Sequence, residues 1–295
     1  MADTPVLGRV LSAMVTPMRS DGVVDLDAAQ RVATHLVDNG HDGLVISGTT
    51  GESPTTSSQE KDQLLRAVIE AVGDRAVVIA GVGSNDTAHT LLSARQAETA
   101  GADGLLVVTP YYNKPPQAGL VAHFTAVAEA TGLPVMVYDI PGRTGTAIAK
   151  DTYLRIAEHE RIVAVKDARA DLWLATELMM ATDLQWYSGD DSMNLSHFAN
   201  GAVGFVGVTS QLAPAAYRAM ADAVLSGRWD DARALHRRLV PLVNAVMNVT
   251  QGAIMAKAGL KSLGLLDSAA ARLPLVEADA ELTELVRRAL ETTTN

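Results

Sequence analysis

The chain has 295 residues, of which 48% are hydrophobic and 20% charged, a composition typical of a soluble globular protein with an ample core. Its formal net charge of −10 argues against nucleic acids and anionic membranes as partners, and its lack of cysteine excludes disulfides, thiol catalysis and cysteine-ligated metals. Because no signal-like start and no apolar run of roughly 18–20 residues is visible, we expect a cytoplasmic protein without membrane spans.

Eight short apolar runs follow one another along the chain, and helix-like segments separate them. The runs cover residues 9–17, 43–48, 76–83, 104–110, 134–141, 162–168, 184–191 and 202–210. Continuous apolar runs are typical of parallel strands that are covered on both faces. Between the first two runs, residues 25–40 carry Leu26, Ala29 and Val32 at helical spacing, which predicts an amphipathic helix.

Three junctions between helices and strands repeat one pattern. Residues 39–48, 100–108 and 200–208 each contain a glycine that ends a helix, two linking residues, and a glycine that enters a strand. Eight such strand–helix units predict an α/β fold of the (β/α)₈ TIM-barrel type, whose usual length is about 250 residues. A doubly wound open sheet is the alternative, but the glycine-rich stretch 81–85 lacks a nucleotide-binding pattern.

The pattern changes from about Arg228 onward. Residues 228–250, 252–264 and 279–295 have helical character, and no strand-like run separates them. The sequence therefore predicts a catalytic barrel domain at residues 1–227 and a C-terminal helical domain at residues 228–295.

A lysine at the end of an apolar run is the first candidate for chemistry. In TIM barrels the active site lies at the C-terminal ends of the strands, where Lys166 ends the sixth run. Burial of an unpaired ammonium lowers its pKa, and a neutral amine can attack a carbonyl to form a Schiff base. The alternative is a surface lysine whose charged end reaches water.

Other polar residues are expected at the same end of the barrel. Thr49 and Thr50 lie in the glycine-rich stretch GTTGE, where their hydroxyls can bind a carboxylate. The alternative is a plain turn before a helix N-cap, since Ser53, Thr55 and Ser57 follow. Tyr138 ends the fifth run and can face Lys166 as a proton relay, or it can be a core tyrosine. Arg143 follows in a Pro/Gly turn, suited either to a substrate carboxylate or to a surface salt bridge.

Metal chemistry is not expected. Asp190 and Asp191 could bind a metal, but they precede a helix-like segment and are better explained as helix caps. The seven histidines fall mostly on predicted helices, without the spacing of a metal site.

Taken together, GTTGES, YDIPGRTG and the strand-end Lys166 resemble, in order and spacing, the dihydrodipicolinate synthase/N-acetylneuraminate lyase family of Schiff-base aldolases. The resemblance covers nearly the whole chain, and VVTPYYNKPPQ with YDIPGR is similar to actinobacterial members of the synthase branch. It implies the condensation of pyruvate with L-aspartate 4-semialdehyde to 4-hydroxy-tetrahydrodipicolinate, in diaminopimelate and lysine biosynthesis. It further implies that no cofactor is needed and that the chain forms a homotetramer, a dimer of dimers.

The resemblance also implies roles for individual residues. Lys166 would form the imine with pyruvate, and Tyr138 would be the general acid/base, linked through Thr50 to Tyr112 of a neighbouring subunit. The chain departs from many relatives at Asp139, where they have asparagine.

Substrate binding is implied for a second set of residues. Thr49 and Thr50 would bind the pyruvate carboxylate, which the backbone carbonyl of Val206 would face. Arg143 would hold the carboxylate of the semialdehyde, with Gly189 nearby.

Two alternatives to this function stay open. The first is another pyruvate-dependent lyase, acting on N-acetylneuraminate or a sugar acid; Arg143 argues against it, because sialic-acid members generally lack this arginine. The second is a catalytically silent barrel that binds small acids, against which the combination of Lys166, Tyr138, Thr50 and Tyr112 argues.

A regulatory lysine site is the last feature that the resemblance implies. The positions that match it are Ser53, Pro54, Ser58, Lys61, Asn85, His89 and Tyr111. Ser58 and Lys61 stand where lysine-sensitive members tend to have histidines, and His89 stands where a glutamate is common. Because the attraction for a cationic ligand is lost, we expect weak inhibition by L-lysine or none.

Overall fold

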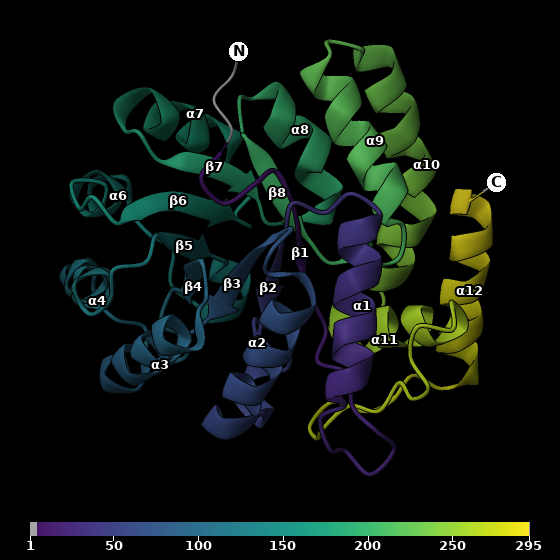
Figure 1. Ribbon diagram of the computed structural model, residues 1–295. Helices are drawn as coiled ribbons and strands as arrows, with labels where there is room; N and C mark the ends of the chain where they lie inside the picture. Colours follow the sequence, from purple (N-terminus) through teal and green to yellow (C-terminus); the bar gives the residue numbers. More distant parts are fainter. Residues whose placement is uncertain (1–4, 295) are drawn as a thin grey trace.

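The computed structural model describes residues 5–294, which form a closed barrel of eight parallel strands surrounded by helices (Figure 1). The strands are β1 (Val10–Ala13), β2 (Gly43–Ile46), β3 (Val77–Gly81), β4 (Gly104–Val108), β5 (Val135–Asp139), β6 (Ile162–Asp167), β7 (Gln185–Ser188) and β8 (Gly204–Gly207). They pair in chain order, and β8 closes the barrel by pairing with β1, where Val206 lies opposite Leu11. The predicted TIM barrel is thus confirmed.

Helices cover the outer face of the barrel. They are α1 (Leu26–Asp38), α2 (Ser58–Val72), α3 (Thr87–Ala100), α4 (Gln117–Glu129), α6 (Lys150–Ile156), α7 (Leu172–Ala181), α8 (Asn194–Ala199) and α9 (Pro214–Leu225). Four short helices follow the ends of strands β2, β5, β7 and β8: the 3₁₀ helix η1 (Ser53–Thr55), α5 (Pro141–Thr144), and the 3₁₀ helices η2 (Asp191–Met193) and η3 (Thr209–Gln211). The predicted helix at residues 25–40 is α1. It begins at Asp25, whose side chain accepts a hydrogen bond from the backbone N–H of Ala28, as an N-cap should.

The repeated glycine junctions have a steric cause. The helix-ending glycines Gly40, Gly101 and Gly201 all have left-handed φ angles, between +93° and +105°. At the strand entries, a side chain would collide with the neighbouring strand: a Cβ on Gly204 would lie 2.3 Å from the carbonyl oxygen of Arg9. Glycine is therefore required at both ends of the junction.

Three further helices follow the barrel: α10 (Trp229–Met247), α11 (Gly252–Ser262) and α12 (Ala280–Thr294). Figure 1 shows them gathered on one side of the barrel, where α10 packs against both α9 and α12. The predicted boundary between residues 227 and 228 falls between α9 and α10 and stays a prediction. Within residues 5–294 no single helix is long and apolar enough to cross a membrane, although α10 and α11, bent by 115°, reach that length and composition together.

Candidate active site

Lys166 lies in the barrel wall, and its side chain is only 4% exposed. Its neighbour across the β5–β6 pair is Tyr138, and the Lys166 Nζ lies 4.4 Å from the centroid of the Tyr138 ring. Burial lowers the pKa of Lys166 to about 8, an effect that the Asp191 carboxylate opposes and the Arg143 guanidinium supports. The alternative of a surface lysine is therefore wrong, and an appreciable share of this amine is neutral near pH 8.

Tyr138 remains a proton donor over the whole physiological range. Its side chain is buried, and burial raises the pKa of its phenol to about 12, although Arg143 opposes the shift. A protonated phenol beside a neutral amine can deliver a proton to a departing oxygen and then take one back. The predicted contact between Tyr138 and Lys166 is confirmed.

The GTTGE stretch forms a turn between β2 and η1. Thr50 is buried and Thr49 half-buried, and both face a cavity that Lys166 also lines. The predicted helix N-cap after this turn is confirmed at Ser57, whose hydroxyl accepts from the backbone N–H of Glu60 at the start of α2, whereas the N-cap position of η1 is Glu52, so the two threonines cap neither helix. The threonine hydroxyls are therefore available to a ligand.

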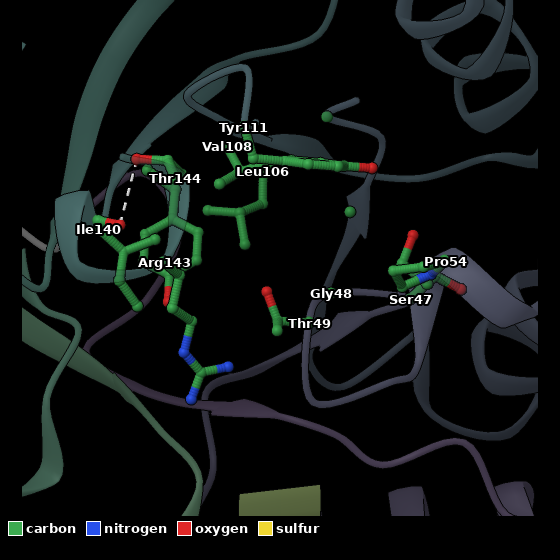
Figure 2. Close-up of a pocket in the computed structure, with 14 residues that line it drawn as sticks. Ser47, Gly48, Thr49, Pro54, Leu106, Val108, Tyr111, Ile140, Arg143 and Thr144 are labelled. Atoms are coloured by element: carbon green, nitrogen blue, oxygen red, sulfur yellow. Dashed lines mark hydrogen bonds between the residues drawn. The ribbon is translucent and has the colours of Figure 1, made fainter. Parts of the chain in front are cut away.

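One cavity of about 300 Å³ at the C-terminal end of the barrel brings most of the predicted residues together. Its walls include Thr49, Thr50, Tyr138, Arg143, Lys166 and Gly189. A second cavity of about 180 Å³ adjoins it and shares Thr49, Tyr138 and Arg143. Figure 2 shows the side chains that border this second cavity, among them Thr49, Arg143 and Tyr111. The two volumes together suit two small acids.

Arg143 lies in α5 at the mouth of both cavities. Its side chain is exposed, and among residues 5–294 it forms no ion pair with any carboxylate. The surface salt-bridge alternative is therefore wrong for the described chain, and an unpaired guanidinium at a cavity mouth attracts a carboxylate ligand.

Two residues of the predicted site lie outside the main cavity. Val206 is buried in β8, and Val208, two residues further on, lines the cavity instead. Tyr112 is 88% exposed, has a left-handed φ of +74°, and borders a shallow depression next to Arg143. The roles of Val206 and Tyr112 stay predictions.

Among the described residues, those matched to a lysine site are divided between two cavities and other surfaces. Ser53, Pro54 and Tyr111 line the second cavity, whereas Ser58 and Lys61 line a separate space of about 30 Å³. The backbone oxygen of Asn85 accepts a hydrogen bond from the Asn113 side chain at 2.8 Å, and His89 lies in α3. Weak inhibition by lysine stays a prediction.

The two aspartates after β7 bind backbone groups. Asp190 is the N-cap of η2 and accepts from the N–H of Ser192 at 2.9 Å, so the predicted helix cap is confirmed for it. Asp191 is buried and accepts from the N–H groups of Val208 and Thr209 at 2.9 and 3.0 Å. These bonds fix the end of β8 beside the cavity.

Sequence reasoning missed the contribution of the C-terminal helices to the cavity. Met247, the last residue of α10, and Asn248 both line it. No local pattern marks them, because they meet the strand ends only when α10 folds back on the barrel.

Comparison with known proteins identifies the family. Residues 6–293 match the Dihydrodipicolinate synthetase family. This chain belongs to that family. It is 60% identical to the 4-hydroxy-tetrahydrodipicolinate synthase of Kineococcus radiotolerans over 274 aligned residues, and the alignment covers 93% of this chain and 89% of the relative. It is likewise 60% identical over 280 residues to the enzyme of the same name from Acidothermus cellulolyticus, covering 95% of this chain and 90% of the relative.

Solved members of the dihydrodipicolinate synthetase family have the same fold. The lysine-bound synthase of Cyanidioschyzon merolae superposes with a TM-score of 0.95 at 38% identity, covering 99% of both chains. The synthase of Aquifex aeolicus superposes with a TM-score of 0.93 at 34% identity, covering 97% of this chain and 98% of the relative. The family resemblance that the motifs predicted is confirmed.

Proposed function

We propose that this chain condenses pyruvate with L-aspartate 4-semialdehyde to 4-hydroxy-tetrahydrodipicolinate, through an imine at Lys166. Its membership of the dihydrodipicolinate synthetase family and its 60% identity to two enzymes named 4-hydroxy-tetrahydrodipicolinate synthase support this activity. The observation that carries the mechanism is a buried lysine with a pKa of about 8, beside the protonated Tyr138.

Imine formation is the first step. The hydroxyls of Thr49 and Thr50 bind the pyruvate carboxylate, and the neutral Lys166 amine attacks the ketone carbon. Tyr138 donates its proton to the hydroxyl of the resulting carbinolamine, which leaves as water. The nitrogen of the imine carries a positive charge, so it withdraws electrons and acidifies the adjacent methyl group.

Carbon–carbon bond formation follows. The Tyr138 phenolate removes a methyl proton, and the resulting enamine attacks the aldehyde carbon of the semialdehyde, whose oxygen takes up a proton. Arg143 holds the carboxylate of this second substrate at the cavity mouth. The amine of the semialdehyde then attacks the imine carbon, closes the ring and releases Lys166, so one water is lost overall.

The neighbouring subunit completes the proton relay in this proposal. Tyr112 is exposed next to Arg143, so it can extend toward a neighbouring subunit and reach the Thr50 hydroxyl of that subunit's site. A homotetramer assembled as a dimer of dimers supplies such a contact.

Borohydride reduction tests the proposal. In the presence of pyruvate, reduction should trap one three-carbon adduct, and peptide mapping should place it on Lys166. The buried Lys257 and the exposed Lys150 are internal controls in the same sample. A label on either of them, or on no lysine, would refute the mechanism.

Arg143 favours this activity over that of a sialic-acid or sugar-acid lyase, because its unpaired guanidinium matches a carboxylate on the second substrate. Product analysis with pyruvate and a panel of aldehydes distinguishes the two. The semialdehyde should be preferred over sugar-derived aldehydes, and the opposite order would contradict the proposal.

A further inference from the structure

A buried ion pair lies directly behind the threonine turn. Glu52 ends the GTTGE stretch with its side chain 2% exposed, and its carboxylate pairs with the ammonium of Lys257, which is 0% exposed. Lys257 belongs to α11, so the pair joins segments that are 205 residues apart in the sequence. Neither residue lines the cavity that contains Lys166. Their charges therefore do not contact the reactants and need another explanation.

The C-terminal region binds both oxygens of the Glu52 carboxylate. Lys257 donates to one oxygen, and the backbone N–H of Arg272 donates to the other at 2.9 Å. The Lys257 ammonium also donates to the backbone oxygen of Ala270 at 2.7 Å, which fixes its own direction. The C-terminal region therefore sets the orientation of the Glu52 carboxylate, and with it the orientation of Glu52 itself.

The Arg272 side chain also binds the segments on either side of the threonine turn. Its guanidinium donates to the backbone oxygen of Gly22 at 3.0 and 2.8 Å and to that of Thr55 at 2.8 Å. It also forms an ion pair with Glu60 in α2. The loops after β1 and β2 are thus tied to the same short stretch of the C-terminal region.

The threonine turn needs stabilising contacts from other segments because its own backbone conformation is unfavourable. Ser47 and Glu52, on either side of the threonines, have left-handed φ angles of +59° and +55°. Residues with side chains rarely adopt this conformation, and it persists only where the surroundings enforce it. Inside the turn, the Glu52 N–H donates to the Thr49 carbonyl at 3.1 Å, and the hydroxyl of Thr16, in the loop after β1, donates to the Gly51 carbonyl at 2.6 Å.

A buried ion pair is not an efficient way to stabilise a fold, because desolvation offsets most of the attraction and apolar residues of similar volume do as well. A buried ion pair does, however, fix the orientation of both side chains, since each charged hydrogen bond has a preferred geometry. The two buried lysines differ in this respect: Lys257 forms an ion pair with a carboxylate, whereas Lys166 forms none among the described residues and only feels the more distant charge of Asp191.

We propose that the Lys257–Glu52 pair is a positioning device that holds Thr49 and Thr50 in the orientation that binds the pyruvate carboxylate. The inference rests on the proposed function, and it makes Lys257 a positioning residue that acts through Glu52 and the turn. Loss of the pair should therefore weaken pyruvate binding selectively.

The test uses a double variant, Glu52→Gln with Lys257→Met, which removes both charges and leaves neither one buried alone. Lys261→Met is the matched control, because Lys261 lies in the same helix and forms an exposed ion pair with Glu277 at 3.1 Å. Three quantities are measured on each full-length protein: the unfolding temperature, the pyruvate dependence of borohydride trapping at Lys166, and the KM for each substrate.

We expect the double variant to unfold near the wild-type temperature. The pyruvate concentration for half-maximal trapping should rise about tenfold or more, because small misplacements of binding groups have large effects. The KM for the semialdehyde should stay close to that of the wild type, and Lys261→Met should match the wild type throughout.

Several results would overturn the inference. They are an unchanged pyruvate dependence in the double variant, an equal rise of both KM values, or loss of folding, which would make the pair a requirement of the fold. If the proposed function is wrong, the result is distinguishable from these: the wild type itself would then show no adduct at Lys166. The inference about the ion pair would be refuted as well.

Discussion

Asp139 allows a direct test of how the burial of an ionisable group affects the stability of this barrel. Asp139 is the last residue of β5, and its carboxyl is fully buried; one oxygen accepts from the Tyr153 hydroxyl at 3.0 Å, the Ile148 N–H at 3.3 Å and the Arg169 guanidinium at 3.5 Å, while the second oxygen has no partner among the described residues. Burial raises the pKa of Asp139 from 3.8 to about 6, although Arg169 opposes the shift. Replacement by asparagine, Asp139→Asn, removes the charge and keeps an acceptor for Tyr153.

The expected change in the free energy of unfolding on Asp139→Asn follows from proton linkage. Because the pKa in the folded state lies above the unfolded value, the favourable contribution of the neutral Asp139 is fully present below pH 3.8 and is lost as the pH rises to about 6. The rise of the pKa from 3.8 to about 6 corresponds to about 3 kcal/mol, the most that ionisation of Asp139 costs above pH 6. Asp139→Asn should therefore stabilise the protein at pH 8 by about 1–3 kcal/mol, and hardly at all at pH 4.

Denaturant unfolding of both proteins at pH 4 and pH 8 measures this difference. Tyr153→Phe is a useful comparison, because it removes a hydrogen bond that lowers the pKa of Asp139 and keeps the carboxyl, so its stability should still depend on pH. An equal free-energy difference between wild type and Asp139→Asn at the two pH values would refute the reasoning, since the effect would then come from packing and not from ionisation.

Three further predictions concern catalysis and regulation. The rate of borohydride trapping should rise about tenfold between pH 7 and pH 9, as Lys166 loses its proton around its pKa of about 8; a flat profile would contradict this. Arg143→Ala should lower kcat/KM for the semialdehyde by a factor that corresponds to about 1.5–3 kcal/mol and leave pyruvate trapping largely intact; equal loss of both would indicate a role in folding. L-Lysine should bind with a Kd above about 1 mM in titration calorimetry, and much tighter binding would refute the expected insensitivity.

Local patterns in the sequence were enough for the barrel and for the core of its site. Each apolar run became a strand because both of its faces are covered, by the barrel interior and by helices, and each glycine junction reflects a local steric need. Since neighbouring parallel strands end at the same edge, the order of the runs alone predicted that Tyr138 and Lys166 would meet.

Other properties of the site depend on contacts between distant segments. The sequence left open whether Lys166 reaches water and whether Arg143 pairs with a surface carboxylate, because both depend on side chains that only the folded chain brings close. The contribution of Met247 and Asn248 to the cavity was missed for the same reason.

The sequence by itself therefore determined the fold class and the family, and it singled out Lys166 as the candidate reactive amine, since these follow from periodicity and from motifs of a few adjacent residues. Only the tertiary structure decided the burial that brings the pKa of Lys166 to about 8 and the pairing of Glu52 with Lys257 across 205 residues. Desolvation and ion pairing depend on everything that surrounds a group in space, and no local stretch of sequence contains that information.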